Sequence, residues 1–274
     1  MAFLCRRYDV SRSGFYAWLA RDGSRRQRND EALGEHIERI HRDSGGRYGS
    51  PRVHEVLKRE GIRCSNKRVA RLMRERGLRA RVSRLYRKGP GMVRKFFAKT
   101  ANLRLDEPLP TRPDQIWVGD ITYLRLGKHW RYLATVMDLF SRRIVGWTLS
   151  RNRTVTVTLR ALKRAIAARE PKPGLLFHSD RGIEYSSYDY QDFLKAKGIV
   201  PSMNRPRHCQ DNGHMESFFH SLKAELTHQR IYASDAELNA SVACYINRFY
   251  NEKRVHSSLG YHSPVEFERL AFAQ

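Results

Sequence analysis

The chain has 274 residues, 41% of them hydrophobic, which is enough to build a core for one large domain or two smaller ones. It carries 52 lysines and arginines against 28 aspartates and glutamates, a net charge of +24, and this excess favours a nucleic-acid partner over a membrane surface. The sequence contains no apolar stretch of membrane-spanning length, no signal pattern and no Cys-x-x-Cys pair among its four cysteines, so we expect a cytoplasmic protein without a zinc site or a disulfide framework.

Basic residues are concentrated in the first part of the chain. Positions 1–105 hold 28 basic and 10 acidic residues, which leaves 24 and 18 for the remainder. This distribution indicates that the amino-terminal part makes the main electrostatic contact with nucleic acid and that the carboxyl part contains the chemistry.

Residues 1–80 have the pattern of short helices separated by capping residues. Residues 3–19 predict a short helix, a turn and a second helix, a spacing that helix-turn-helix units share with plain helical hairpins. Three more helices are predicted, the first over residues 31 to about 42. The residues that mark helix ends are Ser11 or Ser13, Gly45 with Gly46, Ser50 as N-cap with Pro51, and Ser65.

The helix that begins after Ser65 has apolar residues on one side and arginines on the other. The outward residues are Arg68, Arg71, Arg74 and Arg76. Arginines on a helix are usually only solvated, so their role as DNA contacts is a hypothesis that rests on the charge of the whole region.

Residues 81–111 lose helical periodicity and combine recurring basic residues with glycine and proline. Such a composition predicts an extended basic linker that can follow a phosphate backbone.

A strand is predicted over residues 116–124 because the segment is β-branched and aromatic and begins after Pro113. Alternation places Asp120 on the same side as Ile116 and Val118. A carboxylate on an apolar strand face is costly unless it is paired, hydrogen-bonded or bound to a metal. Asp120 is therefore a candidate site residue.

Two hairpin strands, a helix over residues 154–168 and a strand that ends at Asp180 are predicted next. Asp180 thus lies at the carboxyl end of a strand, where α/β sheets place their sites. Asp138 falls in the hairpin turn, and we interpret it as structural because aspartate there accepts local backbone hydrogen bonds. His178 could orient Asp180 or touch DNA, but a hydrogen-bonded core histidine is the favoured interpretation.

A helix is predicted from Asn212 onward, with Asn212, Glu216 and Lys223 along one face. Considered alone, that face is typical of a solvated helix, and Asn212 is either a cap or a substrate contact. Asp120, Asp180 and Glu216 together form an all-oxygen set that suits Mg²⁺ or Mn²⁺.

The chain resembles bacterial insertion-sequence transposases whose catalytic core is related to retroviral integrases, the DDE polynucleotidyl transferases. Two further features carry this resemblance: 35 residues separate Asp180 from Glu216, and a basic residue, Lys223, stands seven after Glu216. The resemblance covers most of the chain from about Arg47 onward. The matching segments are Trp117-Val-Gly-Asp-Ile-Thr-Tyr, Val136-Met-Asp-Leu-Phe-Ser-Arg-Arg-Ile-Val-Gly-Trp, His178-Ser-Asp-Arg-Gly, Asp211-Asn-Gly-His-Met-Glu-Ser-Phe-Phe and Tyr250-Asn-Glu-Lys-Arg-Val-His-Ser-Ser-Leu-Gly-Tyr.

The resemblance implies an α/β fold with an RNase H-like catalytic core, a mixed five-stranded sheet with helices, over residues 112–230. An all-α helix-turn-helix region over 1–80 and the basic linker over 81–111 precede it. Residues 231–274 would form a carboxyl-terminal helical extension, which could contact DNA or brace the core, and bracing is the favoured interpretation.

The resemblance also implies two-metal DNA cleavage and strand transfer. Two Mg²⁺ (or Mn²⁺) ions would be held by Asp120, Asp180 and Glu216, and Lys223 would bind a DNA phosphate. The implied partners are double-stranded DNA, as insertion-sequence ends and target, and further copies of the chain on that DNA. The implied location is the cytoplasm, in association with the nucleoid.

Other functions stay open at this stage. The chain could be a DNA-binding regulator, or a partial transposase subunit that needs an upstream-frame protein for activity. It could also be a nuclease that only cuts, which strand-transfer products would exclude.

Overall fold

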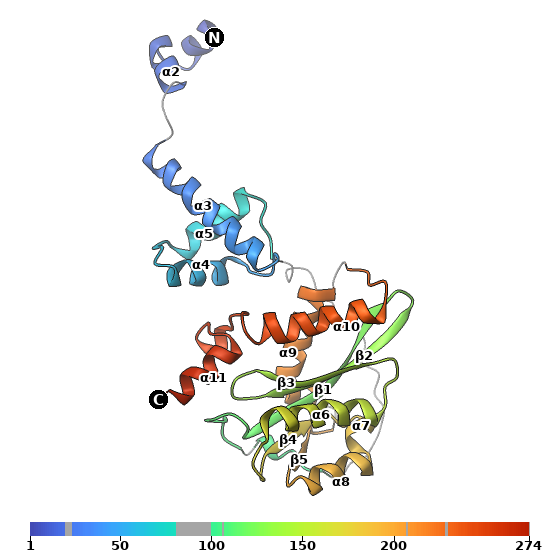
Figure 1. Cartoon of the computed structure of the whole chain (residues 1–274). Helices are drawn as coiled ribbons and strands as arrows, with labels where there is room; N and C mark the ends of the chain where they lie inside the picture. Colours follow the sequence, from blue (N-terminus) through green and yellow to red (C-terminus); the bar gives the residue numbers. More distant parts are fainter. Residues whose placement is uncertain (20–23, 81–99, 106, 207, 228–229, 274) are drawn as a thin grey trace. The chain divides into compact units, whose positions relative to one another are not determined.

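The computed structural model describes residues 1–19, 24–80, 100–105, 107–206, 208–227 and 230–273 (Figure 1). The chain divides into two compact units, residues 1–83 and residues 84–274, and each is described by itself. Most of the predicted linker, residues 81–99, lies outside the described residues. Every helix in the described ranges is too short or too polar to cross a lipid bilayer.

The first unit is entirely helical. Helices α3, α4 and α5 contact one another around apolar side chains that include Ile37, Val53, Leu57 and Leu72, all at most 1% exposed. The helices are α1 (Ala2–Arg7), α2 (Arg12–Leu19), α3 (Arg25–Asp43), α4 (Ser50–Arg59) and α5 (Asn66–Glu75). The predicted helical character of residues 1–80 is confirmed within the described ranges.

The helix ends show which capping predictions hold. Of the two candidates before α2, Ser11 accepts a hydrogen bond from the Gly14 N–H at 3.0 Å, and Ser65 accepts one from Arg68 N–H at 3.2 Å at the start of α5. The prediction for Ser50 was wrong by one residue. Gly49 is the N-cap of α4, and Ser50 is already helical because Pro51 fits the first turn.

The second unit contains a five-stranded sheet in the order β3-β2-β1-β4-β5. The first three strands are antiparallel, and β4 and β5 run parallel to β1. The strands are β1 (Ile116–Leu126), β2 (His129–Asp138), β3 (Ile144–Ser150), β4 (Leu176–Ser179) and β5 (Val200–Met203). The predicted mixed sheet, with three antiparallel strands first, is confirmed.

Helices cover both faces of the sheet. Alternation in β1 sends Ile116 and Val118 into one core with α9 and the helices after it, and sends Trp117 into another core with α6 and α8. The helices are α6 (Val155–Arg169), α7 (Ile183–Ser186), α8 (Tyr188–Ala196), α9 (Gly213–Leu222) with the π-helix η4 (Lys223–Thr227), α10 (Asp235–Ala243) with the π-helix η5 (Cys244–Tyr250), and α11 (Pro264–Phe272). Short 3₁₀ turns are η2 (Leu103–Leu105), η3 (Cys209–Asn212) and η6 (Ser257–Leu259).

The carboxyl-terminal segment contacts the sheet through polar groups. Asn251 extends the edge of β3, because its side chain accepts from the Ile144 N–H at 3.0 Å and donates to the Ile144 carbonyl at 2.9 Å. Glu268 of α11 accepts from Arg143 at 2.6 Å and from Arg169 at 2.9 Å. These bonds brace the core in the manner predicted for the extension.

Candidate active site

Asp120 and Asp180 lie side by side at the point where two parallel strands separate. Strands β1 and β4 pair in register up to Gly119 opposite Ser179, and each aspartate is the next residue. Asp120 accepts a hydrogen bond from the Ile121 N–H at 2.7 Å, and Asp180 accepts one from the Gly182 N–H at 2.9 Å. The sheet topology therefore brings together two residues that are 60 positions apart in the sequence.

The surroundings of the two carboxyl groups disfavour their ionised forms. Burial raises the pKa of Asp120 to about 8, with a further contribution from the negative charge of Asp180. Burial also raises the pKa of Asp180. Both shifts mean that the site contains more negative charge than its own surroundings stabilise.

Sequence reasoning missed two charged residues at this site. Arg153 forms an ion pair with Glu184 at 2.6 Å. Its positive charge partly opposes the rise that burial causes in the pKa values of Asp120 and Asp180. A side chain at Gly182 would meet the Asp180 carboxylate at 2.9 Å and the Glu184 carboxylate at 3.0 Å, so a larger residue there would displace these carboxylates. The position of Glu184 four residues after Asp180 was a signal that could have identified it.

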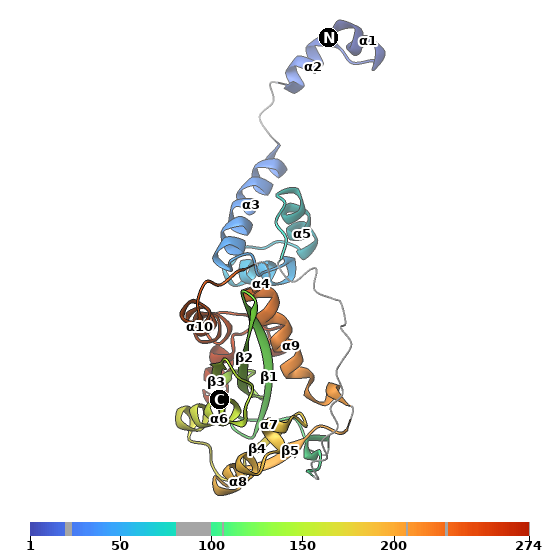
Figure 2. The same ribbon diagram turned by 90° about the vertical axis from the view of Figure 1, so that its right-hand side faces the viewer.

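Glu216 lies in the first turn of α9, which contacts β1 (Figure 2). The Asn212 side chain ties this helix to the strand, because its amide donates to the Gly119 carbonyl at 3.1 Å. Asn212 occupies the N-cap position but makes no capping hydrogen bond with its side chain. Glu216 is exposed, and its charge contributes to the raised pKa of Asp120.

The donor set suits a hard divalent cation. Asp120 and Asp180 provide only oxygen ligands, and their excess negative charge is what a bound cation would neutralise. Within the described ranges, however, no three histidine, cysteine, aspartate or glutamate side chains are arranged so that they could hold a metal ion together. The structure thus brings the two aspartates together and leaves Glu216 nearby but separate.

Lys223 lies on the π-helix that continues α9. Its Nζ is 4.2 Å from the centre of the Tyr123 ring. Burial lowers the pKa of Lys223, while the negative charge of Asp120 acts in the opposite direction. Lys223 is therefore within electrostatic reach of the paired aspartates.

His178 is a core residue. Its ring nitrogens lie 2.8 Å from the Ser202 hydroxyl and 2.7 Å from the Asn204 side-chain oxygen, and it is fully buried. Burial lowers the pKa of His178 to about 4, so the ring is neutral near pH 7. The favoured interpretation as a hydrogen-bonded core histidine is confirmed.

Asp138 is structural, as expected. It is fully buried and accepts hydrogen bonds from the Asp114 N–H at 2.6 Å and the Ser141 N–H at 3.0 Å. Burial raises its pKa to about 6. The carboxylate closes the turn between β2 and β3.

Three of the four arginines predicted to contact DNA form ion pairs inside the helical unit. Arg68 and Arg71 both contact Asp30 of α3 at 2.6 Å, and Arg76 contacts Glu38 at 2.8 Å. Arg74 is exposed on α5. The DNA-binding role of these arginines stays a prediction, with Arg74 the least engaged in packing.

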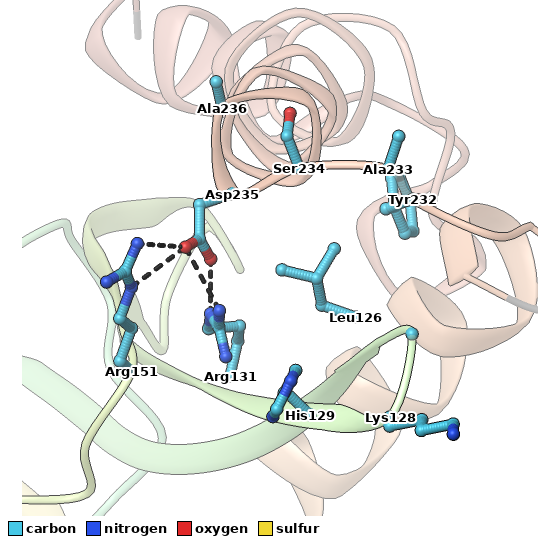
Figure 3. A pocket seen from close by; sticks show the side chains of 11 residues that line it. Leu126, Lys128, His129, Arg131, Arg151, Tyr232, Ala233, Ser234, Asp235 and Ala236 are labelled. Atoms are coloured by element: carbon cyan, nitrogen blue, oxygen red, sulfur yellow. Dashed lines mark hydrogen bonds and ion pairs between the residues drawn. The ribbon is translucent and has the colours of Figure 1, made fainter.

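A separate pocket of about 610 Å³ lies between the β1–β2 turn and the start of α10 (Figure 3). Asp235 accepts hydrogen bonds there from Arg131 and Arg151. Hydrogen bonds from Arg131 lower the pKa of Asp235 to about 2. Arg131 and Arg151 neutralise the Asp235 carboxylate, and neither Asp120 nor Asp180 lines the pocket. We therefore interpret Asp235 as a residue that braces the fold.

Sequence and structure comparisons relate the chain to known proteins. Two integrase core domain families match residues 110–209 and 197–264, and an HTH-like domain family matches residues 27–86. The transposase InsF for insertion sequence IS3A of Escherichia coli is 38% identical, over 98% of this chain and 94% of its own. The transposase for insertion sequence element IS904 of Lactococcus lactis is 36% identical, over 92% and 99%. The integrase catalytic core domain of HTLV-2, solved with magnesium, is 19% identical with a TM-score of 0.45, over 57% of this chain and 97% of that chain.

Proposed function

The chain belongs to the insertion-sequence transposases with an integrase core domain, and from this premise we propose that Asp120, Asp180 and Glu216 are its catalytic carboxylates. The reaction is DNA transposition: cleavage at the end of an insertion sequence, followed by transfer of the freed strand to target DNA. The observation that carries the assignment is the pair of half-buried aspartates at the ends of two parallel strands. Their excess negative charge is unfavourable for folding and useful for cation binding.

We infer that Asp120 and Asp180, once Glu216 joins them, would hold two Mg²⁺ or Mn²⁺ ions. Bound there, the ions would polarise the phosphodiester and lower the pKa of the attacking hydroxyl. Asp120 and Asp180 supply ligands from the rigid sheet, while Glu216 approaches from α9, which Asn212 holds against β1. No side chain of the protein acts as nucleophile in this scheme.

Two basic residues would offset negative charge at the site, Lys223 that of the DNA and Arg153 that of the aspartates. Lys223, near Asp120, binds a DNA phosphate beside the reacting one. Arg153 limits the repulsion between the aspartates before the substrate arrives, and its pairing with Glu184 fixes its position. Electrostatic groups arranged in advance in this way stabilise the charge of a phosphoryl-transfer transition state.

The helical unit would bind the ends of the insertion sequence. Its match to an HTH-like domain and its positive charge support this role. We further propose that several copies assemble on the DNA. The alternative is a partial transposase subunit that needs an upstream-frame protein for activity.

The test is incubation of the full chain with a labelled insertion-sequence end and Mg²⁺ or Mn²⁺, with cleaved and joined strands resolved. Wild type should give both products, and Glu216→Gln should give neither while it retains DNA affinity. Glu252→Gln, a change of the same chemistry at another exposed glutamate, is the matched control. Substantial cleavage by Glu216→Gln would refute the assignment. Binding without products in wild type, corrected by the upstream-frame protein, would identify a partial subunit.

A further inference from the structure

Two large aromatic side chains are exposed on the β1–β2 hairpin, a few residues from Asp120. Tyr123 is 56% exposed and Trp130 is 49% exposed. They lie on one face of the hairpin, because residues paired across two strands share a face and Trp130 pairs with Arg125, two residues after Tyr123. Their rings meet edge to face with centres 5.0 Å apart. We call Tyr123 and Trp130 the aromatic pair.

The opposite face of this hairpin is buried. Leu124 and Leu126 pack in the core with Tyr232. Strand β4 pairs with β1 only over residues 116–119, so from Asp120 onward β2 is the only strand beside β1 in the described part of the chain. The hairpin thus extends from the sheet with its apolar face covered and the aromatic pair facing solvent.

A cation links the aromatic pair to the candidate active site. The ammonium of Lys223 lies 4.2 Å from the centre of the Tyr123 ring, close enough for a cation–π contact. The negative charge of Asp120 favours the protonated form of the same lysine. Alternation along β1 places Tyr123 and Asp120 on opposite faces of the strand, so Lys223 is the group that links the aromatic pair to the carboxylates, at the edge of β1 that β4 leaves uncovered.

We propose that the aromatic pair stacks against an unpaired nucleobase at the DNA end, while Lys223 contacts an adjacent phosphate. Inside a duplex each base is covered on both faces by its neighbours, so an exposed ring can stack only on a base that has left the helix. Aromatic rings combined with cations are the arrangement that binds single-stranded nucleic acid.

This inference rests on the proposed function and deepens it. It assigns the form of the substrate next to the carboxylates: the end of the duplex is opened, and at least one nucleotide beside the reacting phosphodiester is unpaired. Charge complementarity supports DNA as the occupant, since the chain has an excess of 24 positive charges.

A binding experiment without metal tests the inference. The full chain is titrated with a fluorescent short duplex that carries an oligothymidine overhang, and with the same duplex ending bluntly. Wild type should prefer the overhang, and Trp130→Ala should weaken overhang binding by roughly fivefold to a hundredfold with blunt binding unchanged. Trp130→Phe should keep the preference. Tyr188→Ala removes an aromatic side chain that is 88% exposed on α8 and is the matched control.

A second measurement uses only wild-type protein and is independent of how the variants fold. The overhang thymines are replaced by 5-iodouracil, which crosslinks to stacked aromatic rings on irradiation, and the crosslinked peptide is identified by mass spectrometry. Crosslinks to Tyr123 or Trp130 support the inference. Equal affinity of wild type for both duplexes, or crosslinks confined to other residues, would overturn it. Overhang preference in a protein that never cleaves DNA would refute the proposed function while leaving this inference intact.

Discussion

The second unit contains two groups of buried or half-buried carboxylates with opposite electrostatic surroundings. One is a buried pair, Glu225 with Arg254, which we call the brace. Glu225 is 1% exposed and accepts hydrogen bonds from Arg254 at 2.8 Å and Tyr245 at 2.9 Å. At the candidate active site, Asp120 and Asp180 lie side by side, and Arg153, the nearby cation, is already paired with Glu184.

The difference separates acids that hold the fold from acids that are available for chemistry. A buried carboxylate with its own arginine is satisfied by the protein alone. A buried pair with excess negative charge is completed only by something that the protein does not supply, such as a cation. The following predictions test this distinction.

The largest effect is expected from Asp120→Asn. Strand cleavage should fall by roughly a thousandfold or more, because cation-based stabilisation of the transition state is worth several kcal/mol. Above pH 8, where the Asp120 carboxyl is ionised, the melting temperature of the metal-free protein should instead rise, since the change removes a repelled charge beside Asp180. Product formation and thermal unfolding of the same preparation check both directions. A variant that lost stability along with activity would contradict the contrast with the brace.

The reverse pattern is expected at Arg254. Arg254→Leu leaves Glu225 buried without its arginine and should lower the free energy of unfolding by about 3–5 kcal/mol. Activity per folded molecule should be unchanged. Urea unfolding measures the loss, and the double variant Glu225→Leu with Arg254→Leu is the control that should recover most of it. A loss below about 1 kcal/mol for the single variant would show that this pair does not brace the core.

The contribution of Asp120 to the stability of the metal-free protein should fall as pH rises from about 4 to about 8. The pKa of Asp120 is raised from 3.8 to about 8, so in this window the folded state binds the proton more tightly than the unfolded chain. The stabilisation is complete below pH 4 and is lost as pH increases through 8. Because the side chain is partly exposed, we expect on the order of 2–3 kcal/mol.

Denaturant unfolding at several pH values checks this slope. Asp120→Asn should remove this contribution, so the difference in free energy of unfolding between the variant and wild type should change with pH over this window. Mg²⁺ or Mn²⁺ should stabilise wild type more at pH 8 than at pH 5, since the carboxylates must be ionised to bind a cation. A slope that Asp120→Asn does not change would assign the titration to another group.

The sequence predicted the sheet well because its strands are marked by local composition. The segment around Asp120 is β-branched and aromatic, and the run that ends at Asp180 is apolar, so both strands and the proximity of the aspartates followed from pattern and topology. Resemblance selected the RNase H-like arrangement among the folds that the pattern allowed.

Tertiary contacts could not be predicted in the same way. Arg153 and Glu184 are 31 positions apart, and only the packed fold shows that they meet beside the aspartates. Likewise, the helical period placed Arg68 and Arg71 on an outward face, but it gave no information about Asp30 of the neighbouring helix. Periodicity predicts which face of a helix points away from the core. It does not predict which residues of a neighbouring helix contact that face.

The smallest effect is expected from the arginines of the helical unit, where pairing again separates structure from binding. Arg74→Gln should reduce the slope of log affinity against log salt by about 0.9, the value for one lost phosphate contact, with no change in stability. Arg71→Gln should lower the melting temperature of the unit slightly instead, because it breaks a partly exposed pair with Asp30. DNA titrations at several salt concentrations and thermal unfolding distinguish the two. If Arg71→Gln changed the salt slope and Arg74→Gln did not, the arginine with an acidic partner would be the DNA contact, and pairing would not mark structural residues in this unit.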